Sequence, residues 1–168
     1  MPHIVDIFEL ARRGDTFESE APVAEMPSLC SFLADGEGVL HFKAEGLGEI
    51  RGRPAARLSV SGAVNVPCAR CLKGVPVELE SEGVFVFTKT EAEANAMPVA
   101  DDVDWDDVTV GSRRFSLKDW AEEEAILSLP QAVYHEACEE DGDAFDEDEA
   151  EEDEARPNPF AVLASLKK

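Results

Sequence analysis

The chain has 168 residues, the length of about one domain, and 44% of them are hydrophobic, which is enough to form a buried core. Its 37 acidic and 15 basic residues give a formal net charge of −22 at neutral pH. Nucleic-acid affinity comes largely from cationic side chains that displace condensed counterions, so this charge argues against unaided binding of RNA or DNA. It favours basic proteins or metal ions as partners.

The N-terminal residues predict a short helix and no targeting segment. Residues 1 to 10 carry no basic side chain and no long apolar run, so we expect neither a secretory signal nor a membrane span. A cytoplasmic protein with reduced cysteines is therefore expected. Residues 4 to 13 place apolar side chains at helical spacing and Gly14 follows as a stop, with an edge strand as the alternative. Residues 15 to 36 show little periodicity and are expected to be a connecting segment, with one short element near residues 29 to 33.

From Val39 onward the sequence has the pattern of strands. Between residues 56 and 68 apolar side chains alternate with polar ones, which directs one set toward a core and the other toward solvent. The alternation resumes over residues 75 to 88, after the segment CARCLKG, so the two runs are expected to pair as an antiparallel hairpin. Too few helices intervene for a parallel sheet, and the pattern predicts an antiparallel β-meander of about four or five strands.

One main helix is expected after an irregular acidic segment over residues 89 to 107. Ser116 is a suitable N-cap with Asp119 three residues later, and Pro130 ends the helix. Its predicted apolar face consists of Leu117, Trp120, Ala121 and Leu127. The helix should cover one face of the sheet, which makes residues 1 to 138 a single α+β domain.

An acidic run follows this domain. Twelve of the sixteen residues from 139 to 154 are Asp or Glu. Such a run repels itself and cannot bury enough apolar area to fold, so residues 139 to 156 are expected to be a disordered linker. The segment DGDAFDEDE has the carboxylate density of a calcium loop but lacks the EF-hand spacing, so the linker is the preferred interpretation.

Residues 157 to 168, PNPFAVLASLKK, predict a short C-terminal helix or docking motif. Asn158 can cap it, Pro159 suits its first turn, and the terminal lysines suit the C-terminal end of its dipole. A helix of about 12 residues or fewer is marginal alone in water, so this one needs a surface to lie on. The residues expected to contact a partner are Asn158, Pro159, Phe160, Leu163 and Leu166. Packing on the protein's own sheet is the alternative.

Cys68 and Cys71 are spaced so that a turn directs both thiols toward one point, as in structural zinc sites. Such sites almost always have four protein ligands, and the candidates for the other two are His135 and Cys138, just after the predicted helix. If that helix folds back over the hairpin, the four side chains can meet as a zinc cage. The alternatives are small turn residues with a free Cys138, or a redox pair, although redox pairs of this spacing open a helix. Cys30 is expected in the core.

Signals for catalysis or nucleic-acid binding are sparse. The sequence has no nucleophile elbow, no phosphate-binding glycine loop and no H-E-x-x-H motif, so we expect no enzyme. Direct RNA contact, the other alternative, depends on a set of arginines placed on one face of the sheet. These are Arg51, Arg53, Arg57 and Arg70. Arginines on a solvated face without RNA are the simpler interpretation.

Three segments resemble one known family: VNVPCARCLKGVPVEL, AEEEAILSLPQAVYHEACE and PNPFAVLASLKK. In this order they are similar to the large ribosomal RNA subunit accumulation protein YceD family, found in bacteria and plant plastids. The resemblance implies a role in the accumulation of 23S ribosomal RNA, hence in building the large subunit, with no established enzymatic activity. Some branches of the family carry further cysteines after the position of Cys138, where this chain is acidic, so the resemblance does not assign a zinc site.

These observations predict a non-enzymatic ribosome biogenesis factor. Its negative charge suits basic ribosomal or assembly proteins, with ribosomal RNA contacted indirectly. The alternative is a small accessory module that binds zinc through the cysteine pair or contacts RNA through the arginines.

Overall fold

The computed structural model describes residues 3–97 and 103–138, and residues Met1–Cys138 form one compact unit. The expected acidic linker over 139–156 and the C-terminal motif over 157–168 lie outside the described residues and stay predictions. Over the described ranges, no helix is both long enough and apolar enough to cross a bilayer.

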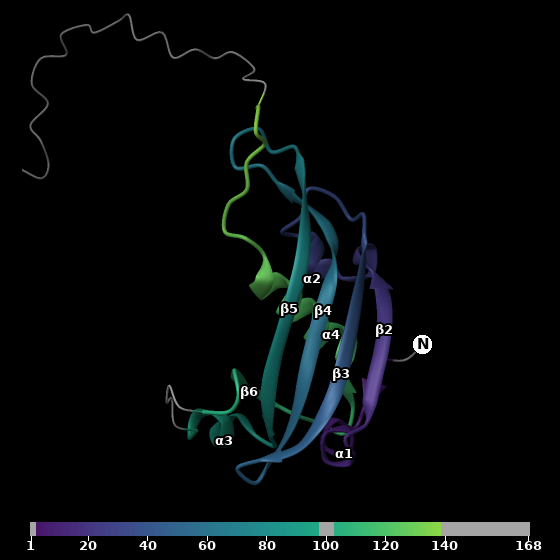
Figure 1. Cartoon of the computed structure of the whole chain (residues 1–168), viewed down its shortest axis with the longest axis vertical. Coiled ribbons are helices and arrows are strands. Elements are labelled where there is room, and N and C mark those ends of the chain that lie inside the picture. Colours follow the sequence, from purple (N-terminus) through teal and green to yellow (C-terminus); the bar gives the residue numbers. More distant parts are fainter. Residues whose placement is uncertain (1–2, 98–102, 139–168) are drawn as a thin grey trace, which may run out of the picture. The chain divides into compact units, whose positions relative to one another are not determined.

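The described residues form an α+β fold around a five-stranded sheet with strand order β2-β3-β4-β5-β6 (Figure 1), which confirms the expected fold class. The strands are β2 (Thr16–Pro22), β3 (Val39–Ile50), β4 (Arg53–Pro67), β5 (Gly74–Thr88) and β6 (Asp107–Val110). A separate pair joins β1 (Ile4–Val5) to β7 (Phe115–Ser116). The sheet order follows the chain order because each strand from β2 to β5 pairs with the next one along the chain.

The long β4–β5 hairpin is built as the alternation predicts. Leu58, Val60, Val64 and Val66 are buried on one face of β4, and the intervening side chains are exposed or half-buried. The two strands pair antiparallel from Ala55 opposite Val86 to Pro67 opposite Gly74. The turn that closes the hairpin is therefore the segment that holds Cys68 and Cys71.

Two strands differ from the sequence expectation. Residues 16 to 22, expected to be a connection, form β2 and pair antiparallel with β3. The sequence did not indicate this strand because its apolar pattern is weak and only Ala21 is fully buried. The fifth strand, β6, pairs parallel with β5. The meander is therefore antiparallel over four strands only, and α3 (Glu91–Asn95) lies between β5 and β6 in the sequence.

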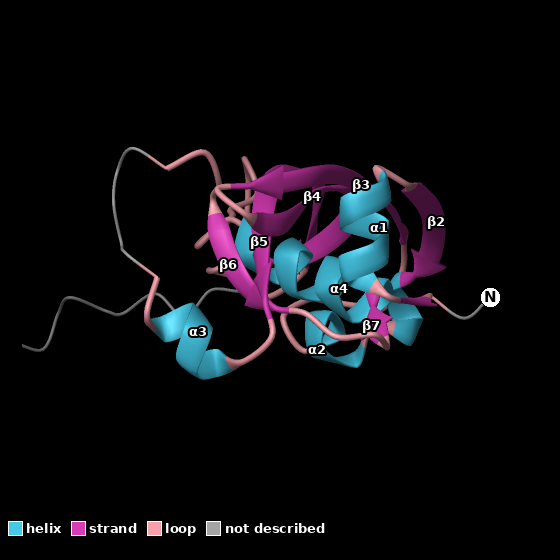
Figure 2. Ribbon diagram, turned by 90° about the horizontal axis from the view of Figure 1, so that it is seen from below, coloured by secondary structure: helices cyan, strands magenta, loops and turns pink. Residues whose placement is uncertain are grey.

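Three helices and a short turn lie on one face of the sheet, and no helix of the described residues covers the other face (Figure 2). They are α1 (Ile7–Arg13), α2 (Pro27–Cys30) and α4 (Leu117–Ser128), with a short 3-10 turn, η1 (Val23–Glu25), before α2. Helix α1 packs on β3 and β4, α4 packs on β3, β4 and β5, and α2 packs on α4. Asp6 caps α1 by accepting the backbone N–H groups of Phe8 and Glu9, and Gly14 ends it with a φ of 70°.

Helix α4 begins and ends close to the predicted residues. The Ser116 side chain accepts the N–H of Asp119 as its N-cap. Leu117, Trp120 and Ala121 are buried as expected, but Leu127 is 77% exposed, so its assignment to the apolar face is wrong. Residue 125, not 127, continues an i, i+4 row from 117 and 121, and Ala125 is fully buried there.

Candidate functional site

The turn between β4 and β5 is closed by its own backbone. The N–H of Cys68 donates to the carbonyl of Lys73 at 2.9 Å, and the N–H of Leu72 donates to the carbonyl of Cys68 at 3.0 Å. Leu72 has a φ of 61°, in the left-handed region that non-glycine residues rarely adopt. This tight turn points the Cys68 side chain into the protein, where it is fully buried, and leaves Cys71 half-buried.

The segment after α4 runs back to this turn. We call residues 130–138 the strap; it has no regular secondary structure. The carbonyl of Val133 accepts the N–H of Ala69 at 2.9 Å, and the Arg70 guanidinium lies 5.5 Å from the ring centre of Tyr134. These contacts place the last residues of the strap beside the cysteine turn.

Four side chains meet there. They form the cysteine–histidine cluster: Cys68, Cys71, His135 and Cys138. The Cys68 and Cys138 sulfurs are 3.5 Å apart, and the Cys71 sulfur is 3.3 Å from Nδ1 of His135. All four donor atoms lie within 4.8 Å of one another. The structure thus brings together two pairs of residues that are more than sixty positions apart in the sequence.

The surroundings of the cluster favour a thiolate at Cys68. Backbone N–H groups, first that of Cys71 and then those of Arg70 and His135, lower the pKa of the Cys68 thiol from 9.0 to about 5, against the effect of burial. The hydrogen bond to Cys68 raises the pKa of Cys138, which therefore keeps its proton and donates it. In the cluster, the Cys138 thiol therefore donates a hydrogen bond to the Cys68 thiolate.

The His135 ring is oriented by the hairpin. Its Nε2 lies 3.1 Å from the carbonyl oxygen of Gly74, so the N–H at Nε2 donates to that carbonyl. In this tautomer the lone pair of Nδ1 points at the Cys71 sulfur. An imidazole nitrogen and three sulfurs can hold one soft metal ion. Cys30 lies outside the cluster, and its sulfur is 3.1 Å from the carbonyl oxygen of Val23.

The open face of the sheet carries a second feature, which the sequence analysis did not single out. We call it the acidic face, and its carboxylates are Glu18, Glu20, Glu45, Glu78, Glu80 and Glu82. Lys43 and Arg57 lie among them and pair with Glu45 at 3.5 Å and with Glu82 at 3.6 Å, and Nδ1 of His41 lies 3.2 Å from Glu20. Alternation along strands of known pairing would have found this face.

Three of these carboxylates have no oppositely charged partner among the residues that the structure describes. Glu18, Glu78 and Glu80 make no ion pair with another described residue. Their positions alternate with residues that face the helices, so all three side chains project from the open side. Unpaired negative charge therefore gathers on a face that no described helix covers.

The four arginines of the RNA alternative do not form one patch. Arg51 lies over the ring of Trp105 and 3.6 Å from Asp104, and Arg53 is 4.0 Å from Glu93. Both are at the β3–β4 end of the hairpin, whereas Arg70 is in the β4–β5 turn at the opposite end (Figure 1). The run from Arg57 to the end of β4 alone spans roughly 33 Å at 3.3 Å per residue.

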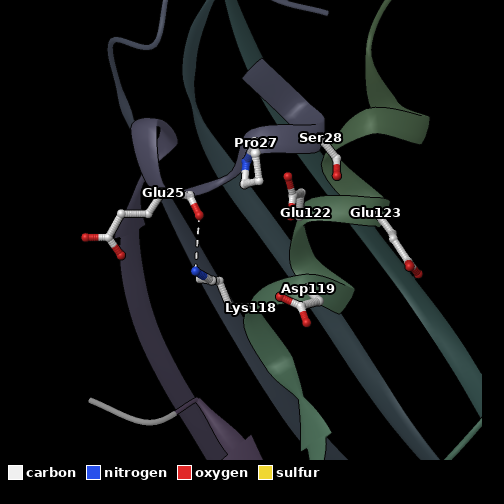
Figure 3. Close-up of a pocket in the computed structure, with 7 residues that line it drawn as sticks. All are labelled: Glu25, Pro27, Ser28, Lys118, Asp119, Glu122 and Glu123. Carbon is white, nitrogen blue, oxygen red and sulfur yellow. Dashed lines mark hydrogen bonds between the residues drawn. The ribbon is translucent and has the colours of Figure 1, made fainter. Parts of the chain in front are cut away.

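A groove between α2 and α4 contains several carboxylates but has a structural explanation (Figure 3). Lys118 donates to the carbonyl of Glu25 at 3.1 Å. Glu122, only 7% exposed, accepts the N–H of Leu29 at 2.9 Å. The N-cap residue of α2 is Met26, whose side chain has no oxygen to accept a backbone N–H. The carboxylate of Glu122, on α4, therefore caps α2 instead. The groove offers no nucleophile paired with a base.

Comparison with known proteins adds the remaining evidence. No solved structure matches the chain. Residues 56–167, 112 of the 168, match the model of the family described as Large ribosomal RNA subunit accumulation protein YceD. That match covers both halves of the cysteine–histidine cluster, strands β5 and β6, and helix α4. The chain therefore belongs to the YceD family, whose description ties it to the accumulation of large-subunit ribosomal RNA.

Proposed function

We propose that this protein supports the accumulation of large-subunit ribosomal RNA without catalysing a reaction, by holding basic ribosomal or assembly proteins on its acidic face. The observation that carries the proposal is the excess of carboxylates on the open side of the sheet, three of them without an ion pair among the described residues. A basic ribosomal protein bound there would be kept soluble and away from wrong RNA contacts until it joins the particle.

The physical basis is long-range attraction. A chain of net charge −22 attracts cationic proteins and repels RNA phosphates. Such attraction raises the rate of encounter and decays over about 8 Å at physiological ionic strength. Ribosomal RNA is then affected indirectly, because its basic protein partner is delivered and the assembled RNA persists.

The distribution of arginines does not favour the RNA-contact alternative. Three of them lie near carboxylates of the same chain, and the fourth lies at the other end of the hairpin. A phosphate backbone would have to displace these carboxylates before it could bind.

The test removes the three unpaired charges without changing shape. In the triple variant Glu18→Gln, Glu78→Gln and Glu80→Gln, affinity for purified basic large-subunit proteins should fall about tenfold at physiological ionic strength, where screening over about 8 Å leaves only charges at the contact surface effective. The matched control neutralises three exposed carboxylates elsewhere: Glu37→Gln, Glu91→Gln and Glu123→Gln. It should bind like the wild type. In cells, the first variant should lower the ratio of large- to small-subunit ribosomal RNA.

Equal binding by both triple variants would reject the acidic face as the binding surface. Tight binding of naked large-subunit RNA by the purified protein at physiological salt would replace the proposal with direct RNA contact. These two results are distinguishable because the first concerns a protein partner and the second an RNA.

The C-terminal motif is a second proposed contact with the same partners. Residues 157 to 167 fall within the family match, and they carry the apolar side chains Phe160, Leu163 and Leu166. We expect truncation after Arg156 to reduce recovery of ribosomal partners from cells. Unchanged recovery would show that the motif is not a docking element.

A further inference from the structure

The cysteine–histidine cluster has the donor set and the spacing of a closed metal site. With zinc–sulfur and zinc–nitrogen bonds of about 2.3 and 2.0–2.1 Å, the edges of a tetrahedral site are about 3.5 to 3.8 Å long. The Cys68–Cys138 sulfur pair, at 3.5 Å, and the Cys71–His135 pair, at 3.3 Å, correspond to two opposite edges. No two of the four donor atoms are more than 4.8 Å apart. That limit exceeds the edge of a tetrahedral zinc site by about 1 Å, a difference that small side-chain rotations can remove.

Groups around the donors already hold them in the orientation that a metal requires. A histidine that binds a metal through one nitrogen usually donates the N–H of the other to a carbonyl or carboxylate, and His135 donates from Nε2 to Gly74 at 3.1 Å. The N–H of Arg70 points at the Cys68 sulfur at 3.5 Å, as backbone amides do toward thiolates. The candidate ligands are thus themselves held by hydrogen bonds with the surrounding backbone.

We propose that the cysteine–histidine cluster binds one zinc ion, which fastens the strap to the β4–β5 turn. Thiolate sulfur and imidazole nitrogen select zinc over magnesium or calcium, which prefer oxygen. All four positions are filled by protein atoms, so the ion has no open position for a substrate water and its role is structural. A catalytic zinc ion has three protein ligands and one open position, so four protein ligands argue against catalysis at this ion.

The ion would contribute most to the ordering of the strap, which few other interactions hold to the turn. The strap has no regular secondary structure. Apart from the side chains of the cluster itself, its contacts with the turn include one backbone bond, at Val133, one ring contact, at Tyr134, and the His135 bond to Gly74. Tyr134 remains 55% exposed, so it buries little apolar area. Because metal binding and ordering of ligands are coupled, zinc should order residues 130–138 and leave the sheet core largely unchanged.

Metal content of the reduced full-length protein tests the site directly. Protein purified without chelator, then stripped and reloaded with zinc chloride, should hold one equivalent of zinc by plasma mass spectrometry. Cys71→Ser and Cys138→Ser should each hold less than a tenth of an equivalent. The matched control is Cys30→Ser, which removes a thiol outside the cluster and should keep one equivalent.

Two further measurements keep the test independent of folding. Cobalt(II) should give the intense visible bands of a tetrahedral thiolate site in the wild type and in Cys30→Ser, but not in Cys138→Ser. Cys138 is at the end of the strap, so circular dichroism should show an intact sheet in that variant. On zinc removal, hydrogen exchange should rise at least tenfold in residues 68–74 and 130–138 and stay unchanged in the centre of β4.

Three results would overturn the proposal. They are less than a tenth of an equivalent of zinc in the reloaded wild type, a full equivalent in Cys138→Ser, and a Cys68–Cys138 disulfide in protein taken from cells under alkylating conditions. The last would mean that the 3.5 Å sulfur contact is the precursor of a bond between the two cysteines.

Discussion

Glu122 shows how a single buried carboxylate can belong to the fold and not to a reaction. It accepts the N–H of Leu29 in the first turn of α2, 93 positions away in the sequence. The residue before α2 is Met26, which offers no oxygen, so this N–H would be buried without a partner if Glu122 were removed. A sequence rich in glutamates gives no signal that distinguishes this one.

We therefore predict that Glu122→Ala destabilises the protein by about 1 to 3 kcal/mol, the cost of an unsatisfied buried donor. Glu122→Gln should cost less, because its amide oxygen can still accept the bond. Glu123→Ala, exposed on the next position of the helix, should stay within about 0.5 kcal/mol of the wild type. Urea unfolding measures all three, and equal losses in Glu122→Ala and Glu123→Ala would contradict the capping role.

The thiolate at Cys68 predicts a pH dependence of the metal-free, reduced protein. Its pKa is about 5 in the folded chain, below the ordinary value of 9.0, so the thiolate favours the folded state. That contribution is complete above pH 9 and is lost as the pH falls toward 5. The difference in urea midpoint between the wild type and Cys68→Ser should therefore be largest near pH 9 and narrow toward pH 5. A constant difference across this window would mean that Cys68 stays protonated.

Among the elements, α4 packs on the sheet through a buried face whose largest side chain is Trp120. The Trp120 ring centre lies 4.9 Å from that of Phe85 and 5.5 Å from those of Phe87 and Phe115, all in edge-to-face geometry. Trp120 is 4% exposed. Because α4 carries the strap at its end, this contact also positions the second half of the cysteine–histidine cluster.

Trp120→Ala should cost about 3 to 5 kcal/mol, the usual loss for a large aromatic side chain removed from a core. The other tryptophan is the matched control: Trp105 is half-buried and stacks with Arg51, so Trp105→Ala should cost less than about 1 kcal/mol. Thermal unfolding followed by circular dichroism compares them. If both variants lost the same stability, α4 would be held by something other than this aromatic contact.

Elements with strong local signals were predictable, and those defined by their neighbours were not. The alternation from Leu58 to Val66 and the Ser116 cap gave β4 and the start of α4 correctly. Strand β2 has a single fully buried side chain, Ala21, and exists because β3 offers it a partner edge. Leu127 was misplaced because a short helix rich in glutamates permits more than one apolar stripe.

The candidate site was predictable in its composition but not in its geometry. The spacing of Cys68 and Cys71 and of His135 and Cys138 indicated two halves. Their meeting requires α4 to lie along the hairpin so that its C-terminal end reaches the β4–β5 turn, which is a property of tertiary packing. The Gly74 carbonyl that orients His135 carries no sequence signal, since any residue supplies one.

At the scale of the whole molecule, the described core lies entirely between Ile7 and Ala125. We predict that residues 1–138 fold alone, with a urea midpoint equal to or higher than that of the full chain at low salt, because truncation removes a dense run of like charge. Urea unfolding of both forms at low salt, followed by circular dichroism, would check this. A midpoint that falls on truncation would place stabilising contacts beyond Cys138.

The sequence distance within the cysteine–histidine cluster sets an order of events during synthesis. Cys71 precedes His135 by 64 positions. At a translation rate of about 5 to 20 residues per second, the first two thiols leave the ribosome roughly 3 to 13 s before their partners. During that interval the nascent hairpin exposes two thiols without their histidine and third cysteine, so the cluster can form only after the chain has been made through Cys138.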